Sequence, residues 1–481
     1  AMVLTPTSRI CLSNNDNNTS NTVFGKKAFV QGADGTTVIG DVGADYNVAI
    51  GEGAMGGDRT SSNFQMNVGI GFGSLRNLTT GDYNVSIGHL SSGSLTTGEK
   101  NNVIGREAFA TSQAGVSNIA IGHQALAAVN HTSNDGSIAI GELALGSKNL
   151  ASGDQFTGAT VAIGHTALTA LTSGVGNTAV GYKALFTEDD GNKCVAIGYE
   201  ALMTQGGRTG DLMNTAVGYQ AAKLITQSQG IVAIGHLALA GGDSYAGNVA
   251  IGNKSMSASQ SGAYNVGVGE SSLLNVNVNG WRNTAVGHNA GDLTTSGTDN
   301  TILGYETDAD TATTSNQTVI GCAGIFKFVS KEYTCDHASN DDNDVASSEA
   351  SPLKIPARAV IKSVSAIASQ LSNLGTYELA VFYSDDTASP SDDAGLTNGV
   401  ELIGAGNATT NSGGSGNAID IEGGSGATLE KAYYNGFDGN GKHVGTGDRY
   451  IHIVNAGTGN GDTDPSTAAK IKVLVEYVGM D

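Results

Sequence analysis

The sequence is poor in several residue types, and each shortage excludes a class of protein. Only 5 of the 481 residues are proline, which excludes collagen-like and proline-rich chains. Lys and Arg number 24 against 45 Asp and Glu, so the net charge is −21, and no basic cluster is present. Nucleic acids and anionic membranes attract surfaces rich in Lys and Arg, so neither is an expected partner. No apolar run reaches the roughly 20 residues of a membrane-spanning helix, and no membrane insertion is expected.

Cysteine is also scarce, with 4 residues and no Cys-x-x-Cys pair. The spacing of the cysteines fits no zinc site. A disulfide between Cys322 and Cys335 is one interpretation, and unpaired buried thiols are the other. The motifs Gly-x-Ser-x-Gly and His-Glu-x-x-His do not occur in the chain. We therefore expect that the protein is not an enzyme.

Glycine, in contrast, is abundant, with 70 residues, and much of it belongs to a repeated phrase. Residues 177–205 read NTAVGYKALFTEDDGNKCVAIGYEALMTQ, in which an apolar triplet, a glycine and an Ala-Leu pair return in the same order. Ten of the seventeen steps between the repeat glycines are 17 residues long, which predicts stacked structural units. The eighteen copies end at Gly25, Gly40, Gly51, Gly71, Gly88, Gly105, Gly122, Gly141, Gly164, Gly181, Gly198, Gly218, Gly235, Gly252, Gly269, Gly287, Gly304 and Gly321.

Each copy is expected to form two short strands and two turns. In the copy Asn248-Val249-Ala250-Ile251, Val and Ile share one face of a strand, because side chains alternate along it. We expect these branched side chains to stack into a continuous core, with the alanine facing outward, where another chain can pack. The glycine then turns the chain at positive φ or lies close to a neighbouring coil. Asn can form a hydrogen-bonded ladder between coils.

The recurring phrases NTAVGYxAL and NVAIGxxAL resemble the head repeats of trimeric autotransporter adhesins and related repeats in phage tail fibres. The resemblance covers residues 21–321. It implies a left-handed parallel β-roll in which three chains lie side by side as a rigid extracellular stalk or head. No heptad stalk or membrane barrel is recognised after Gly321, which favours a virion protein over a bacterial surface protein.

The expected fold is therefore an all-β chain with a β-roll of about eighteen coils and a C-terminal antiparallel sandwich. We expect an N-terminal segment at 1–20, either an expression remnant or a connection to an upstream part, and the β-roll at 21–322. An acidic linker is expected at 323–352 and the sandwich at 353–481. Strands are expected in the sandwich at 357–369, 376–384, 400–406, 449–457 and 469–479, because apolar and polar residues alternate there.

Two groups of residues after the repeats are candidates for binding. The loop at 433–443 carries aromatic rings that could contact a carbohydrate receptor, although the same rings could simply pack the loop onto the sandwich; these receptor-contact candidates are Tyr433, Tyr434, Phe437 and His443. An acidic stretch could hold calcium, although a solvated loop is the simpler interpretation; its carboxylates are Asp341, Asp342, Asp344 and Glu349. No other cofactor is expected.

Either histidine or tyrosine follows many of the repeat glycines directly, for example at His165, Tyr182 and His236. This exchange indicates an exposed site or a packing site between chains. Together these features favour a homotrimeric fibre on the surface of a virus particle. The fibre is expected to contact other virion components and to bind a host glycan or protein. A bacterial surface adhesin and a glycan-degrading tailspike are the alternatives.

Overall fold

In the computed structural model, the chain forms two compact units, unit 1 (Ala1–Gln260) and unit 2 (Ser261–Asp481). We describe each unit by itself. The described residues are 20–31, 37–38, 43–57, 63–127, 135–146, 160–242, 246–259, 261–276, 280–309, 311–322, 326–335, 353–355, 360–370, 377–384, 400–403, 419–421, 431–435, 449–455 and 469–478.

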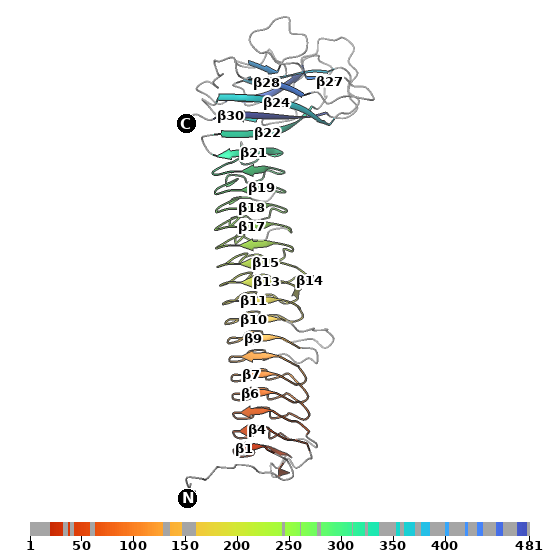
Figure 1. Ribbon diagram of the computed structural model, residues 1–481, viewed down its shortest axis with the longest axis vertical. Coiled ribbons are helices and arrows are strands. Elements are labelled where there is room, and N and C mark those ends of the chain that lie inside the picture. The colour runs from red at the N-terminus through yellow and green to blue at the C-terminus, as the bar shows by residue number, and fades with distance from the viewer. Residues whose placement is uncertain are drawn as a thin grey trace. The chain divides into compact units, whose positions relative to one another are not determined.

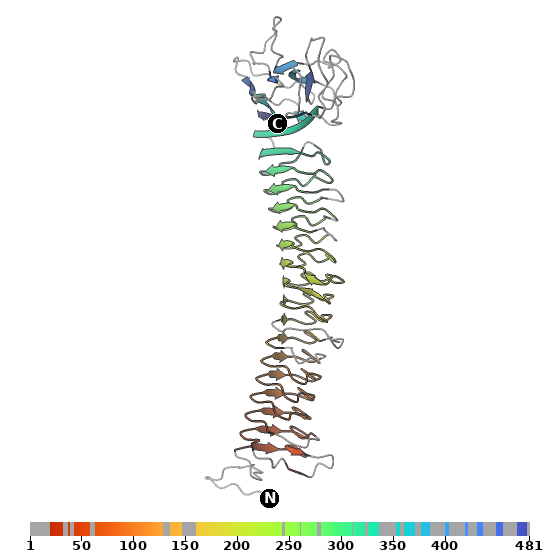
Figure 2. The ribbon, with the colours of Figure 1, turned by 90° about the vertical axis from the view of Figure 1, so that its right-hand side faces the viewer.

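Among these residues the chain has no helix, and the repeats form a parallel β-solenoid. In unit 1 each coil contributes one strand of three residues, and consecutive strands pair in parallel and in register (Figures 1 and 2). These strands are β1 (Thr22–Phe24), β4 (Val48–Ile50), β5 (Val68–Ile70), β6 (Val85–Ile87), β7 (Asn102–Ile104), β8 (Ile119–Ile121), β9 (Ile138–Ile140), β10 (Val161–Ile163), β11 (Thr178–Val180), β13 (Val195–Ile197), β15 (Thr215–Val217), β16 (Val232–Ile234) and β17 (Val249–Ile251).

One of the eighteen predicted copies is not a coil of this stack. The copy that ends at Gly40 overlaps β3 (Thr37–Val38), which pairs antiparallel with β2 (Val30–Gln31). The strand β1 instead pairs directly with β4, so the segment between them is an insertion. A second small pairing joins β12 (Gly191–Asn192) and β14 (Gly210–Asp211) in parallel.

The predicted direction of the strand side chains is wrong. The central residue of the strands, which is most often alanine, faces the core, as at Ala120 and Ala250, which are fully buried. The flanking Val and Ile side chains face outward, and Ile121 is 36% exposed. The interior of the coil is narrow, and the leucine of the Ala-Leu pair fills it; Leu126, for example, is fully buried. Alanine is the usual residue at this inward position, although Val103 and Ile302 are also fully buried there.

The second predicted strand of each copy is a turn. In the segment that follows Gly181, Lys183 and Leu185 have φ values of 54° and 50°. This left-handed conformation is unfavourable for residues with a Cβ atom, and it cannot belong to a strand. The turn folds the chain back in few residues and directs the leucine inward. Figure 2 shows the strands of unit 1 in one column, with the turns beside them.

Buried asparagines connect successive coils, as the sequence predicts. The side-chain Nδ2 of Asn84 donates to Oδ1 of Asn67 at 3.0 Å, and Asn101 donates to Asn84 in the same way at 3.0 Å. Each Nδ2 also donates to a backbone carbonyl, as Asn84 does to Gly98 at 2.9 Å. The ladder therefore satisfies polar groups that are fully buried, which favours one register of the stack.

Unit 2 begins with four parallel strands in register and continues with antiparallel ones. The parallel strands are β18 (Val266–Val268), β19 (Thr284–Val286), β20 (Thr301–Leu303) and β21 (Gln317–Cys322). After β21, the chain turns back into β22 (Phe326–Cys335), which pairs antiparallel with β30 (Ala469–Val478). The strand β24 (Val360–Gln370) pairs with β30 and with β28 (Lys431–Asn435).

A second antiparallel sheet in unit 2 has the order β23-β29-β25-β26, and β27 also pairs with β25. Its strands are β23 (Leu353–Ile355), β25 (Tyr377–Ser384), β26 (Val400–Ile403), β27 (Ile419–Ile421) and β29 (Arg449–Asn455). Each of the five strands predicted after residue 353 is present. The packing of the two sheets as a sandwich stays a prediction. Part of the predicted acidic linker is a strand, because β22 occupies residues 326–335.

The register of β21 and β22 separates the two cysteines of the predicted disulfide. Cys322 is opposite Phe326, at the start of β22, whereas Cys335 ends β22 and is opposite Ala469. The two ends of a ten-residue strand lie about 30 Å apart. A disulfide requires Cα atoms within about 7 Å, so Cys322 and Cys335 of one chain do not pair.

Candidate functional site

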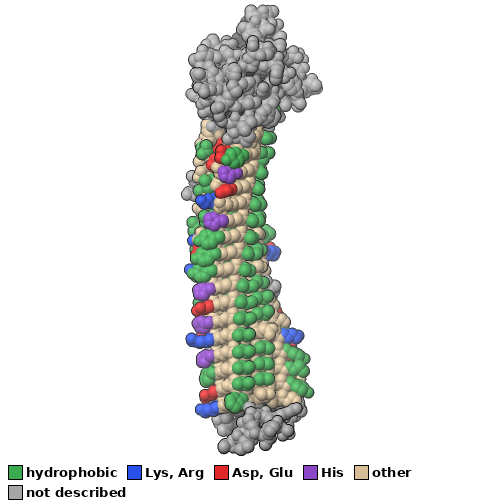
Figure 3. Space-filling view, turned by 60° about the vertical axis from the view of Figure 1, so that its left-hand side comes forward, with side chains coloured by type: hydrophobic (Ala, Val, Ile, Leu, Met, Phe, Trp, Pro, Cys, Tyr) green, Lys and Arg blue, Asp and Glu red, His purple; other side chains and the backbone are tan. Residues whose placement is uncertain are grey.

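The main surface feature of unit 1 is an apolar face formed by the first and third residues of its strands. Because the strands are in register, Val stacks above Val and Ile above Ile, as in the pairing of β16 with β17. The side chains of Ile104, Ile197 and Ile234 are 43%, 40% and 38% exposed. Figure 3 shows the rows of hydrophobic side chains along the strands. A patch this continuous is unusual for a surface that faces only water.

A column of larger side chains borders one edge of this apolar face. It consists of the residue that follows each repeat glycine, and we call it the ring column because most of its members are aromatic or histidine. In unit 1, ring centroids of successive coils lie 5.0 to 5.6 Å apart, with planes inclined by 12° to 19° for the pairs His165–Tyr182, Tyr182–Tyr199 and Tyr219–His236, and by 8° for Tyr199–Tyr219. Phe72 and His89 stack in the same way.

The stacking in the ring column leaves ring edges, rather than ring faces, toward the surroundings. Each inner ring has both faces covered by its neighbours, as Tyr199 has between Tyr182 and Tyr219. The column is also charged in places: Nδ1 of His123 lies 3.4 Å and Nε2 of His165 lies 3.8 Å from the carboxylate of Glu142. The sequence identified these positions as exposed or as packing sites, but it did not predict the stacking.

A second column borders the opposite edge of the apolar face, two residues before each strand. We call it the left-handed edge, because its residues have φ values near 60°, as at Tyr46, Tyr83 and Lys193. Glycine adopts this conformation without penalty and is found there at Gly176 and Gly230. Other coils instead carry large apolar side chains that are about half exposed, including Tyr46, Met66, Tyr83 and Met213. The chain thus tolerates backbone strain in order to place these side chains at the surface.

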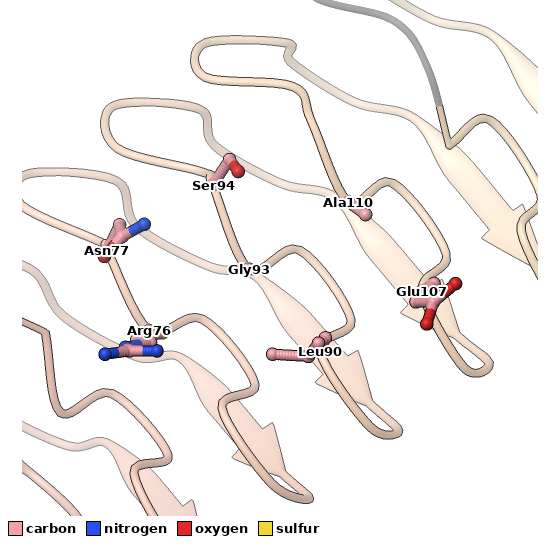
Figure 4. Close-up of a pocket in the computed structure, with 7 residues that line it drawn as sticks. All are labelled: Arg76, Asn77, Leu90, Gly93, Ser94, Glu107 and Ala110. Carbon is pink, nitrogen blue, oxygen red and sulfur yellow. The ribbon is translucent and has the colours of Figure 1, made fainter.

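Away from the apolar face, unit 1 has a groove of about 430 Å³ across three successive coils (Figure 4). The carboxylate of Glu107 lies at one end, where Arg106 donates to it at 2.9 Å and Gln124 at 2.8 Å. These hydrogen bonds, that from Gln124 first, lower the pKa of Glu107 below its ordinary value. The groove is lined by Arg76, Asn77, Leu90, Gly93, Ser94, Glu107 and Ala110.

Inside unit 1, one polar network replaces part of the apolar core. Glu188 is fully buried, and Gln205 donates to its carboxylate at 2.5 Å. Asn214 donates to Oε1 of Gln205 at 2.7 Å, because Cys194 occupies the ladder position below Asn214 and offers no amide oxygen. Burial raises the pKa of the Glu188 carboxyl, and burial also raises the pKa of the Cys194 thiol to about 11. Both groups are enclosed, which indicates a role in the coil rather than in binding.

The candidates predicted after the repeats are only partly described. Tyr433 and Tyr434 lie in β28, opposite Ser365 and Val364 of β24, rather than in a loop. Phe437 and His443 lie outside the described residues, as do the calcium candidates Asp341, Asp342, Asp344 and Glu349. Within the described part of the chain, no group of three or more His, Cys, Asp or Glu residues is arranged to hold a metal ion.

The repeat glycines have a structural role. The φ values are 134° at Gly122 and Gly235, 135° at Gly164, 136° at Gly252, 137° at Gly181, and 140° at Gly198 and Gly218. A Cβ atom on Gly181 would lie 2.3 Å from the carbonyl oxygen of Gly198 in the next coil. Both the backbone conformation and the lack of space require glycine.

Comparison of the chain with protein-family models, with curated proteins and with solved structures finds no match. The described residues include no helix that is both long and apolar enough to cross a membrane. The fold and its surfaces therefore carry the functional argument.

Proposed function

We propose that this chain is the subunit of a homotrimeric fibre on the surface of a virus particle, which serves as a structural and host-attachment protein. The exposed Val and Ile rows of the apolar face are the observation that carries the proposal. The stacked coils supply length and stiffness, and the C-terminal sheets supply attachment. The virion location and the receptor-binding role rest on the resemblance of NTAVGYxAL and NVAIGxxAL to fibre and adhesin repeats.

The apolar face supports assembly because burying it removes a large area of branched side chains from water. Each square ångström of apolar surface buried contributes roughly 25 cal/mol. Val and Ile repeat along the strands of unit 1, so this gain accumulates with every coil. The side chains that the sequence assigns to the core of one chain would thus form a core between chains.

The two edges of the face support a closed ring rather than a two-fold dimer. They differ, since one is the ring column and the other is the left-handed edge. A contact between unlike edges is heterologous and closes when the rotation per copy fits a ring. In a parallel arrangement with the coils level, Met213 of one copy lies opposite Tyr219 of the next, and Lys193 opposite Tyr199. The first pairing is favourable, because it removes apolar surface of Met213 and of the Tyr219 ring edge from water.

The experiment that tests this proposal is a mass measurement in solution by light scattering after size exclusion. We expect three times the mass of the 48.5-kDa chain. The double substitution Ile197→Asp and Ile234→Asp places charges in the apolar face, and we expect it to give monomers. Leu224→Asp is the control, because Leu224 is 46% exposed but lies in a turn. A folded wild-type monomer would overturn the proposal.

A further inference from the structure

We propose that the groove of unit 1 binds a neutral, hydroxyl-rich saccharide unit. This inference rests on the proposed function, because it adds a lateral contact to a host-attachment fibre. It concerns a different surface from the apolar face and from the C-terminal sheets. Its evidence is the shape of the groove, the polar groups around it and the charge of the chain.

The groove exists because two successive coils carry small residues at a position where other coils carry large ones. The fifth residue after each repeat glycine occupies this position, which forms a column along the stack, and it is Gly93 and then Ala110 in the two coils that follow Arg76. Later coils carry Phe186 and Met203 at the same position. The coil therefore accepts large side chains there, and their loss leaves a hollow the size of a small ligand site.

The groups around the hollow suit vicinal hydroxyl groups. The guanidinium of Arg76 lies at one end and the carboxylate of Glu107 at the other, where the carboxylate oxygens can accept a further hydrogen bond beside those they already accept. Hydrogen bonds from Arg106 and Gln124 fix Glu107 in place. The side chain of Leu90 lies between the two ends and offers an apolar contact to the C–H groups of a sugar ring, while Ser94 adds a hydroxyl (Figure 4).

The charges favour a neutral ligand over a charged one. The chain carries a net charge of −21, so an acidic sugar is repelled at long range, and within the groove it meets the ionised Glu107. A cationic ligand is repelled by Arg106 beside that carboxylate and by Arg76 at the other end. A sugar bearing only hydroxyl groups uses both ends without either conflict.

The groove stays accessible in the assembly proposed above. Its residues belong to the turn segment after the ring column, as Leu90 and Gly93 follow His89. The apolar face and its two edges do not include them. A single site of this size binds weakly, but several copies on one fibre act together through their effective concentration.

Saturation-transfer NMR on the full chain tests the inference, with methyl β-D-glucoside and N-acetylglucosamine as neutral probes and glucuronate as the acidic one. We expect transfer to at least one neutral probe and little to glucuronate. Ala110→Phe fills the groove and should reduce the transfer by about tenfold or more. Ala240→Phe places the same side chain on the same column outside the groove, and should leave the transfer unchanged.

A second variant, Glu107→Gln, keeps the shape of the groove but removes the charge, and should weaken transfer severalfold. The inference is overturned if neither neutral probe shows transfer, or if the transfer survives Ala110→Phe. Light scattering on the same samples gives the mass of the assembly, so the test of the groove and the test of the trimer have separate readouts. A monomer whose transfer depends on Ala110 would support the groove and reject the trimer.

Discussion

At the scale of single residues, the repeat glycine is where the coil has least freedom. Gly181 combines a φ of 137° with a backbone carbonyl 2.3 Å from the place of its missing Cβ atom. The clash is with backbone of the next coil, which cannot move without disturbing the parallel pairing of β11 with β13. By comparison, Gly230 has a φ of 66° and open space around it. Substitutions at the two glycines therefore distinguish the cost of a strained φ from the cost of a steric clash.

We expect Gly181→Ala to lower the free energy of unfolding by about 3 kcal/mol or more, because it adds a buried clash to a strained φ. Gly230→Ala should lower it by only about 1 kcal/mol, the usual penalty of the left-handed conformation. Chemical denaturation followed by circular dichroism, at equal chain concentrations, measures both. Equal losses for the two variants would contradict the steric argument.

The roles of the glycines and asparagines could be predicted from the sequence, whereas the direction of the branched side chains could not. Gly181 and Asn84 have properties that few other residues share, so their roles can be read directly. Alternation in a strand, however, shows only which side chains share a face, and not which face is inside. For Val249 and Ile251 hydrophobicity suggested the core, but the side chain that faces inward and is fully buried is that of Ala250. The large side chain that fills this interior, Met256 in this coil, reaches it from a left-handed turn that local pattern does not reveal.

At the scale of the coil, one column of the core shows how the stack tolerates exceptions. Leu78, Leu95 and Leu171 are buried at the seventh position after the repeat glycine, where Glu188 and Gln205 stand in two later coils. Between Glu188 and Gln205 in the chain, Cys194 stands at a position where most coils carry the ladder asparagine. Gln205 connects the gap through Glu188 on one side and Asn214 on the other. This compensation depends on spatial neighbours and was not predicted from the sequence.

The buried carboxyl of Glu188 should make stability depend on pH. Because burial raises its pKa in the folded state, the stability it contributes is complete below the ordinary pKa of about 4.3 and is lost as the pH rises through the folded value. We expect the free energy of unfolding to be lower at pH 8 than at pH 5. Over the whole titration, from below the ordinary pKa to above the folded one, the loss amounts to about 1.4 kcal/mol for each unit by which the pKa is raised.

Glu188→Gln removes this titration and should shrink the difference between pH 5 and pH 8. Glu107→Gln serves as the control, because the pKa of Glu107 is lowered and its loss of stability falls on the acid side. Urea denaturation at the two pH values gives the comparison. If the Glu188→Gln and wild-type proteins lose the same stability toward pH 8, another group causes the pH dependence.

The strands of unit 2 show which elements the sequence could predict. The strands β24, β25, β26, β29 and β30 alternate apolar and polar residues, and each was expected close to its observed bounds. The strand β28 was missed, because KAYYN lies in a glycine-rich stretch that resembles a loop. The groove of unit 1 was missed for a different reason: Arg76, Leu90 and Glu107 come together only through the stacking of three coils.

At the scale of the whole molecule, the proposed assembly depends on how the two edges of the apolar face meet. In the level, parallel arrangement, Gly176 of one copy lies opposite Tyr182 of the next, and Gly230 opposite His236. Small residues thus face large rings at these heights. Elsewhere the left-handed edge carries tyrosine, as at Tyr46 and Tyr83, so a coil accepts this side chain. The edge can therefore be altered without changing the fold of one chain.

We expect Gly176→Tyr to weaken the assembly by about tenfold or more, since the new ring would overlap Tyr182 of the next copy. The coil itself has room, because the nearest atom to a Cβ on Gly176 is Cγ of Lys193 at 3.9 Å. Gly207→Tyr is the matched control: Gly207 also has a positive φ and open surroundings, but it lies in a turn away from the apolar face. Sedimentation velocity over a range of concentrations measures the dissociation of each variant. Equal dissociation of the two tyrosine variants would mean that the left-handed edge does not contact another copy, and the level arrangement would have to be abandoned even if the chain is a trimer.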